Sequence, residues 1–102
     1  ISPEEADNAL NSRNSEIVCD GLLRLTYHDS DWQWVQNLCL HFIKSENIQI
    51  RSLAVTCLGH LARIHHTLDI EQVIPILKNL LHDKEIAGRV EDALDDIEIF
   101  IR

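Results

Sequence analysis

Apolar residues recur at helical spacing along most of the chain, and the clearest example lies in its middle, at residues 46–64. Apolar side chains three and four positions apart share one stripe of an α-helix. This stripe consists of Ile50, Leu53, Ala54, Cys57, Leu58, Leu61 and Ile64. The opposite edge carries no strongly apolar side chain and consists of Gln49, Ser52, Thr56, Gly59 and Arg63. The segment therefore predicts a central helix with one buried side and one outward side.

Similar patterns predict five further helices on either side of the central one. Their expected ranges are 2–13, 15–28, 30–44, 70–83 and 84–101. The helix-capping residues expected for four of them are Ser2, Ser30, Asp69 and Asp83, because a short polar side chain can accept a hydrogen bond from the first turn. Pro75 lies early in the fifth helix and should bend it unless the first turn is loose.

Short connections pair these helices into three consecutive hairpins. A small residue followed at helical spacing by large apolar ones recurs in each pair: Gly21 precedes Leu25, Ala54 precedes Leu58, and Ala93 precedes Ile97. A helical unit repeated every roughly 30–40 residues is typical of stacked helical repeats. The pattern therefore predicts an all-α protein.

Two segments resemble the HEAT-repeat (armadillo-like) family. Residues 73–97, VIPILKNLLHDKEIAGRVEDALDDI, have an apolar first helix with an early proline, an aspartate in the turn, and a second helix with spaced Val and Ala. Residues 38–61, LCLHFIKSENIQIRSLAVTCLGHL, keep the Ile-Arg pair and the Leu-Gly-X-Leu ending. In the last repeat Arg89 precedes Val90, whereas the family pattern places the arginine after it.

The resemblance covers about residues 15–101 and implies an α-solenoid of about three helical hairpins, in a single HEAT-like domain spanning residues 1–102. Such stacks usually bind partners on the surface formed by their second helices. The partner-binding residues implied for this chain are Asp20, Arg24, Tyr27, Gln49, Ser52, Thr56, Arg63, Glu91, Asp92, Asp95 and Asp96.

The net charge of the chain indicates which classes of partner it can bind. Nine Lys and Arg residues face seventeen Asp and Glu residues, giving a formal net charge of -8 over 102 residues. Nucleic acid and anionic membranes are therefore poor partners, because both need a cationic surface. A basic protein is the natural complement of an acidic one, although solubility alone is an equally good reason for acidity.

The positions of the cysteines indicate the cellular compartment in which the protein is expected. Three cysteines, Cys19, Cys39 and Cys57, lie far apart within apolar runs, as reduced and buried thiols do. We therefore expect a cytoplasmic protein, and the sequence contains neither a signal peptide nor a membrane-spanning run. It also contains no methionine, so the natural chain is expected to begin upstream of Ile1.

Residues able to carry chemistry are present, but their spacing does not favour a reaction. Glu91 and Asp95 are four apart, as are Asp92 and Asp96; such carboxylates suit a cationic partner, a solvated face or, less well, a metal ion. The six histidines lack the spacing of a helical zinc site. We therefore expect no catalytic residue, no metal and no cofactor, and a protein that is not an enzyme.

The resemblance extends to small stand-alone bacterial HEAT proteins that serve as immunity proteins in toxin systems. The leading hypothesis is an immunity protein that neutralises a basic, nuclease-type bacterial toxin by covering it with an acidic helical face. The alternative is a HEAT-repeat scaffold or adaptor that binds protein partners without inhibiting a toxin. HEAT-like folds also include DNA glycosylases, which need a basic surface, and bilin lyases, which are longer.

Overall fold

A computed structural model describes residues 2–101, which form six helices and no strand; Ile1, where an upstream extension is expected, lies outside the described residues. In chain order the helices are α1 (Pro3–Leu10), α2 (Ser15–His28), α3 (Trp32–Phe42), α4 (Ile48–His65), α5 (Ile70–Leu80) and α6 (Ala87–Phe100). α5 continues through Pro75 as one helix.

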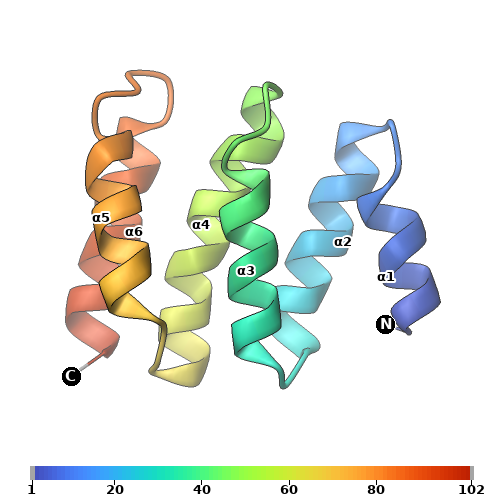
Figure 1. The fold of residues 1–102 in the computed structure, drawn as a ribbon, viewed down its shortest axis with the longest axis horizontal. Coiled ribbons are helices and arrows are strands. Elements are labelled where there is room, and N and C mark those ends of the chain that lie inside the picture. The colour runs from blue at the N-terminus through green and yellow to red at the C-terminus, as the bar shows by residue number, and fades with distance from the viewer. Residues whose placement is uncertain (1, 102) are drawn as a thin grey trace.

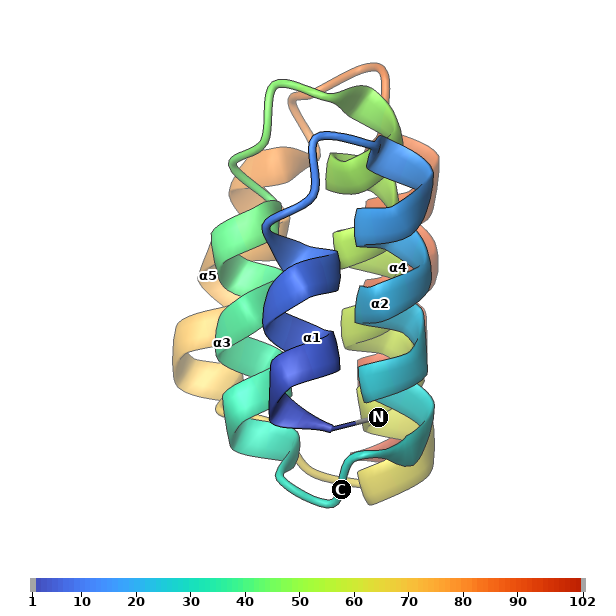
Figure 2. The same cartoon turned by 90° about the vertical axis from the view of Figure 1, so that its right-hand side faces the viewer.

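The helices form three antiparallel hairpins that stand side by side, α1–α2, α3–α4 and α5–α6 (Figure 1). Turned by 90°, the molecule shows two layers: α1, α3 and α5 form one, and α2, α4 and α6 the other (Figure 2). The second helices of the hairpins are therefore neighbours and run in the same direction. The predicted all-α fold, an α-solenoid of three hairpins, is confirmed.

The predicted central helix, α4, is the centre of the packing. It contacts α2, α3 and α6, and Ala54, Leu58 and Leu61 on its buried side are inaccessible to solvent. These side chains belong to one apolar cluster that runs from Ala6 in α1 to Ile97 in α6. Burying one leucine contributes about 1.5–3 kcal/mol, so α4 orders the helices on both sides.

The ends of the first and third helices differ partly from expectation. Ser2 caps α1 as predicted, since its Oγ accepts a hydrogen bond from the Glu5 N–H at 3.2 Å. α1 ends at Leu10 rather than near residue 13, because the polar break begins at its C-cap, Asn11. The prediction that Ser30 caps the third helix is wrong: Asp31 accepts the hydrogen bond from the first turn.

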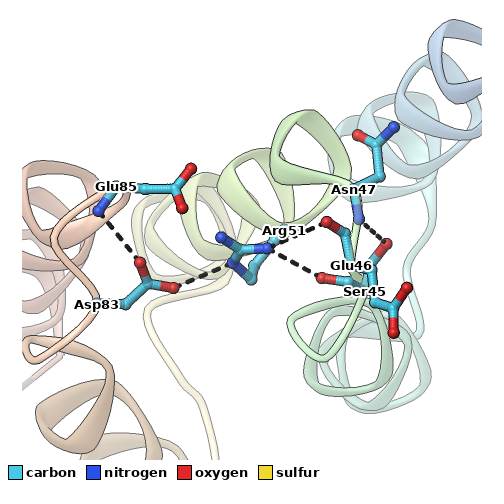
Figure 3. Close-up of polar contacts among 6 residues, drawn as sticks. All are labelled: Ser45, Glu46, Asn47, Arg51, Asp83 and Glu85. Atoms are coloured by element: carbon cyan, nitrogen blue, oxygen red, sulfur yellow. Dashed lines mark hydrogen bonds and ion pairs between the residues drawn. The ribbon is translucent and has the colours of Figure 1, made fainter.

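Asp69 and Asp83 were predicted as caps, but their side chains connect neighbouring hairpins. Asp83 lies in the turn before α6, which begins only at Ala87, and its carboxylate pairs with Arg51 Nε of α4 at 3.1 Å (Figure 3). Asp69 stands at the N-cap of α5 but makes no side-chain cap bond there. Its carboxylate instead accepts a 2.9 Å hydrogen bond from the buried side chain of Gln36 in α3.

Candidate functional site

The candidate site is the outward side of α2, α4 and α6, which we call the second-helix face. All eleven residues implied by the sequence lie on these three helices. Eight of them are exposed: Asp20, Arg24, Tyr27, Gln49, Arg63, Glu91, Asp92 and Asp95. The other three, Ser52, Thr56 and Asp96, are half-buried between helices. Because α4 separates α2 from α6, these residues form a row rather than one cluster.

The closest contact within the face is between α4 and α6. Gly59 is buried there, and a Cβ at that position would lie 3.3 Å from the Ala93 backbone. Gly59 therefore belongs to the helix contact and not to the outward edge predicted for it. One turn later, Arg63 Nε donates to Asp96 Oδ1 at 3.1 Å, and its guanidinium lies 5.4 Å from the centre of the Phe100 ring.

The ion pair between Arg63 and Asp96 reduces the negative charge predicted for the acidic side of α6. The carboxylate of Asp96 is engaged by Arg63, so it offers less charge to a partner than its position in the sequence suggests. Asp92 and Asp95 are exposed, and neither forms an ion pair within residues 2–101. Asp92 and Asp95 therefore contribute free negative charge to the α6 part of the face, as the exposed Asp20 does on α2.

Glu91 lies at the margin of the face. It precedes Glu98 by two helical turns and so shares its edge of α6. Glu98 borders a groove between α5 and α6 at the C-terminal end of the stack. The structure therefore places Glu91 toward that end, apart from the row formed by the other site residues.

Arg89 is a site residue that the sequence analysis did not include. Its Nη1 donates to Thr56 Oγ1 at 3.1 Å, and it borders a hollow of about 330 Å³ with Cys19, Ile48 and Ser52. Arg89 precedes Ala93 by four positions and therefore shares the edge of α6 that contacts α4. That spacing is the signal by which the sequence could have identified it.

The α2 side of the face is joined to α4 by weaker contacts. The ring centres of Tyr27 and His60 are 5.3 Å apart, and Ser15 Oγ donates to Gln49 Oε1 at 3.1 Å. Burial lowers the pKa of His60, and the nearby Arg63 lowers it further. His60 is therefore favoured in its neutral form against the tyrosine ring.

The thiols lie between α2, α3 and α4 and are free. A hydrogen bond with Cys57 and complete burial raise the pKa of Cys39, whereas hydrogen bonds from Cys39 and Thr26 lower the pKa of Cys57. Cys39 and Cys57 are both buried, so neither thiol is presented to a substrate. Within residues 2–101 no group of three or more His, Cys, Asp or Glu side chains could hold a metal ion.

Among residues 2–101, no helix has both the length and the apolar character needed to span a membrane.

Comparison with solved structures gives a match over nearly the whole chain. The matching chain comes from the crystal structure of a CDI complex from Cupriavidus taiwanensis LMG 19424, with 39% sequence identity and a TM-score of 0.88. The alignment covers 98% of this chain and 89% of that chain. No protein-family model matches the sequence, and a search of curated proteins gives no significant match. At this identity and coverage, the protein belongs to the same family as that component of the Cupriavidus CDI complex.

Proposed function

We propose that this protein is the immunity protein of a contact-dependent growth inhibition (CDI) system and neutralises its cognate toxin by binding it. The observation that carries the proposal is its 39% identity, over 98% of its length, to a chain of a CDI complex. A complex of this kind pairs a toxin with its immunity protein. The immunity role is favoured here because the second-helix face presents side chains for binding, while Cys39 and Cys57 behind it are buried.

We propose that the second-helix face contacts the toxin. It is the broad surface made by three parallel helices, in the manner of HEAT-like repeats. The Arg51–Asp83 ion pair between consecutive hairpins supports that relationship, since it links an arginine of one repeat to the turn aspartate of the next. On this face Tyr27, 49% exposed, offers an aromatic anchor.

We further propose that the toxin is basic and of the nuclease type. The chain carries a formal net charge of -8, and Asp92 and Asp95 are exposed carboxylates outside any ion pair of residues 2–101. Carboxylates at that position can occupy the cationic groove in which a nuclease holds phosphates. A protein inhibitor of this type needs no cofactor and no metal, and it acts where the toxin acts, in the cytoplasm.

The test uses the toxin domain encoded beside the gene of this protein. Co-expression should restore growth of cells that produce the toxin, and the purified proteins should form a complex with a dissociation constant on the order of nanomolar. Normal binding with no restoration of growth would contradict the neutralising role. Weak binding to several unrelated proteins, with none to the toxin, would instead favour a scaffold or adaptor.

The surface is tested with two variants of equal charge change. Asp92→Lys with Asp95→Lys should weaken toxin binding at least about tenfold, because it replaces attraction by repulsion at the contact. Glu4→Lys with Asp7→Lys alters exposed carboxylates of α1 and should change affinity less than about threefold. An equal loss in both variants would mean that only net charge matters and would contradict the proposed surface.

A further inference from the structure

The hollow of about 330 Å³ beside Arg89 differs in charge from the rest of the chain. It lies over the N-terminal part of α4, with α2 on one side and α6 on the other. Its lining residues are Cys19, Ile48, Gln49, Ser52, Leu53 and Arg89. The chain carries seventeen Asp and Glu residues, but none of those within residues 2–101 lines this hollow. Among the described residues, the ionised side chain at the hollow is therefore a cation.

The guanidinium of Arg89 is held at the hollow by two successive hydrogen bonds. Its Nη1 donates to Thr56 Oγ1 at 3.1 Å, and Thr56 Oγ1 donates to the Ser52 carbonyl at 3.2 Å. Within residues 2–101, Nε and Nη2 of Arg89 have no hydrogen-bond acceptor, and the side chain forms no ion pair. Two parallel donors on one edge of the guanidinium therefore remain, and such an edge matches the two oxygens of a carboxylate.

Neutral donors accompany the arginine. Gln49 Oε1 accepts the hydrogen bond from Ser15 Oγ, which leaves the amide NH₂ of Gln49 as a donor. The Ser52 hydroxyl also lines the hollow. Ile48 and Leu53 supply its apolar part. The hollow thus combines one positive charge, neutral donors and apolar surface, which suits the carboxylate and the methylene groups of an acidic side chain.

Helix stability does not explain a cation at this position. Arg89 is the third residue of α6, and the first turn of this helix contains no acidic residue. The dipole of a helix favours an anion in the first turn and disfavours a cation. A residue that opposes its own helix in this way is typical of a binding site, and a bound carboxylate would remove the conflict.

We propose that the hollow receives an Asp or Glu side chain of the toxin, whose carboxylate pairs with Nε and Nη2 of Arg89. This inference rests on the proposed toxin complex and adds a contact that selects the toxin. A free anion is disfavoured here, because a chain of net charge -8 repels it. A carboxylate carried by a basic protein is instead brought to the hollow by the attraction of the other charges.

The surrounding charges specify the toxin surface further. Asp92 follows Arg89 by three positions and so lies on the same side of α6. The expected toxin surface therefore presents a carboxylate beside cationic residues. When the toxin covers the hollow, Arg89 loses its contact with water. A toxin with an apolar or cationic side chain at this position would leave the guanidinium covered and unpaired, and would be bound more weakly.

Affinity for the toxin domain encoded beside the gene tests the proposal, with two variants of equal charge change in the natural full-length protein. Arg89→Glu and Lys78→Glu each replace an exposed cation by an anion, and Lys78 lies on α5, outside the second-helix face. If only net charge mattered, both would bind a basic toxin at least as tightly as the original chain. We expect Arg89→Glu to weaken binding at least about thirtyfold and Lys78→Glu to change it less than about twofold. Equal affinities of the two variants would overturn the proposal.

A charge exchange identifies the occupant. Each exposed Asp or Glu of the toxin is changed to Lys in turn, and each toxin variant is titrated with the original chain and with Arg89→Glu. One toxin variant should bind the original chain at least about tenfold more weakly, and Arg89→Glu at least about tenfold more tightly, than the original toxin does. If no toxin variant restores binding to Arg89→Glu, the occupant is not a carboxylate and the proposal is overturned.

Failure of this contact can be distinguished from failure of the proposed function. A toxin that the original chain does not bind would contradict both. A toxin that the original chain and Arg89→Glu bind and neutralise equally would contradict the carboxylate contact alone. Arg89→Lys keeps the charge but lacks the paired donors, so its affinity should lie between those of Arg89→Glu and the original chain. Circular dichroism checks that the helices are intact, as expected because glutamate is favourable in the first turn of α6.

Discussion

The two junctions between neighbouring hairpins are built from different interactions. Between the second and third hairpins, polar side chains cross near both ends of the helices: Arg51 reaches Asp83 near one end, and Gln36 reaches Asp69 near the other. Between the first and second hairpins, an exposed hydrogen bond joins Ser15 to Gln49, beside apolar packing, the buried contact of Thr26 with Cys57 and an aromatic contact. Directional bonds fix a geometry more narrowly than apolar contact does.

This difference divides the second-helix face into two parts. The α4–α6 part is held by the bonds from Arg63 to Asp96 and from Arg89 to Thr56, so its charges have fixed positions. The α2 part, with Tyr27, is joined to α4 by apolar packing and by the contact of Tyr27 with His60, which are less directional. We expect the first part to set the orientation of a partner and the second to adjust to its shape.

The largest effect should come from removing the buried amide at the second junction. Gln36 accepts a 2.7 Å hydrogen bond from the Asp69 N–H and donates to the Asp69 carboxylate. Gln36→Ala leaves both groups without these partners and should lower the free energy of unfolding by about 2–3 kcal/mol. Urea denaturation measures the change.

Its matched control lies at the other junction. Ser15→Ala removes an exposed hydrogen bond to Gln49 and should cost less than about 0.5 kcal/mol. Equal losses in the two variants would mean that the junctions do not differ in the way described.

A smaller effect is expected at Arg51, which has two roles. Its Nε pairs with Asp83, and its Nη1 donates to the Ser45 carbonyl at 3.1 Å. Arg51→Ala should cost about 1–2 kcal/mol, because the pair is only partly exposed. Arg51→Lys keeps the charge but has one nitrogen in place of the separated Nε and Nη1 donors, and should recover less than half of the loss.

Amide hydrogen exchange can show which part of the chain is destabilised in Arg51→Ala. Faster exchange in the turn before α6, with α2 unchanged, is expected if Arg51 acts across the second junction. Uniformly faster exchange throughout the chain would contradict a local role.

The fold could be predicted well from the sequence, because the spacing of apolar residues indicates directly which side of each helix is buried. The α4 stripe of Ala54, Leu58 and Leu61 could be read from spacing alone, and it is buried as predicted. Helix ends were less predictable, since several polar residues nearby could cap each helix. Asp69 and Asp83 have the chemistry of caps, but only the position of the next hairpin shows that their side chains bond to Gln36 and Arg51.

For the candidate site, the sequence indicated which helices and edges face outward but not which charges are paired. Arg63 and Asp96 are 33 positions apart in the chain, so no local pattern reveals that they meet. Gly59 appears at an outward position on the helix, and its burial depends on how closely α6 approaches. Ion pairs between hairpins depend on the tertiary fold. The charge that the face offers to a partner therefore cannot be read from the sequence alone.

The smallest effect expected is a pH dependence at the first junction, where His60 lies against Tyr27. Burial lowers the pKa of His60 from its ordinary value of 6.5, so the folded state favours the neutral ring. The unfolded state binds the proton more readily, and stability should fall as the pH drops from 7 through 6.5 toward the lowered pKa. Nearby, Arg63 opposes the charged ring and Asp96 favours it. In His60→Gln, urea midpoints at pH 7 and pH 5 should differ less than in the original chain. An unchanged difference would mean that other groups set the pH dependence, and that protonation of His60 does not loosen the α2 part of the face.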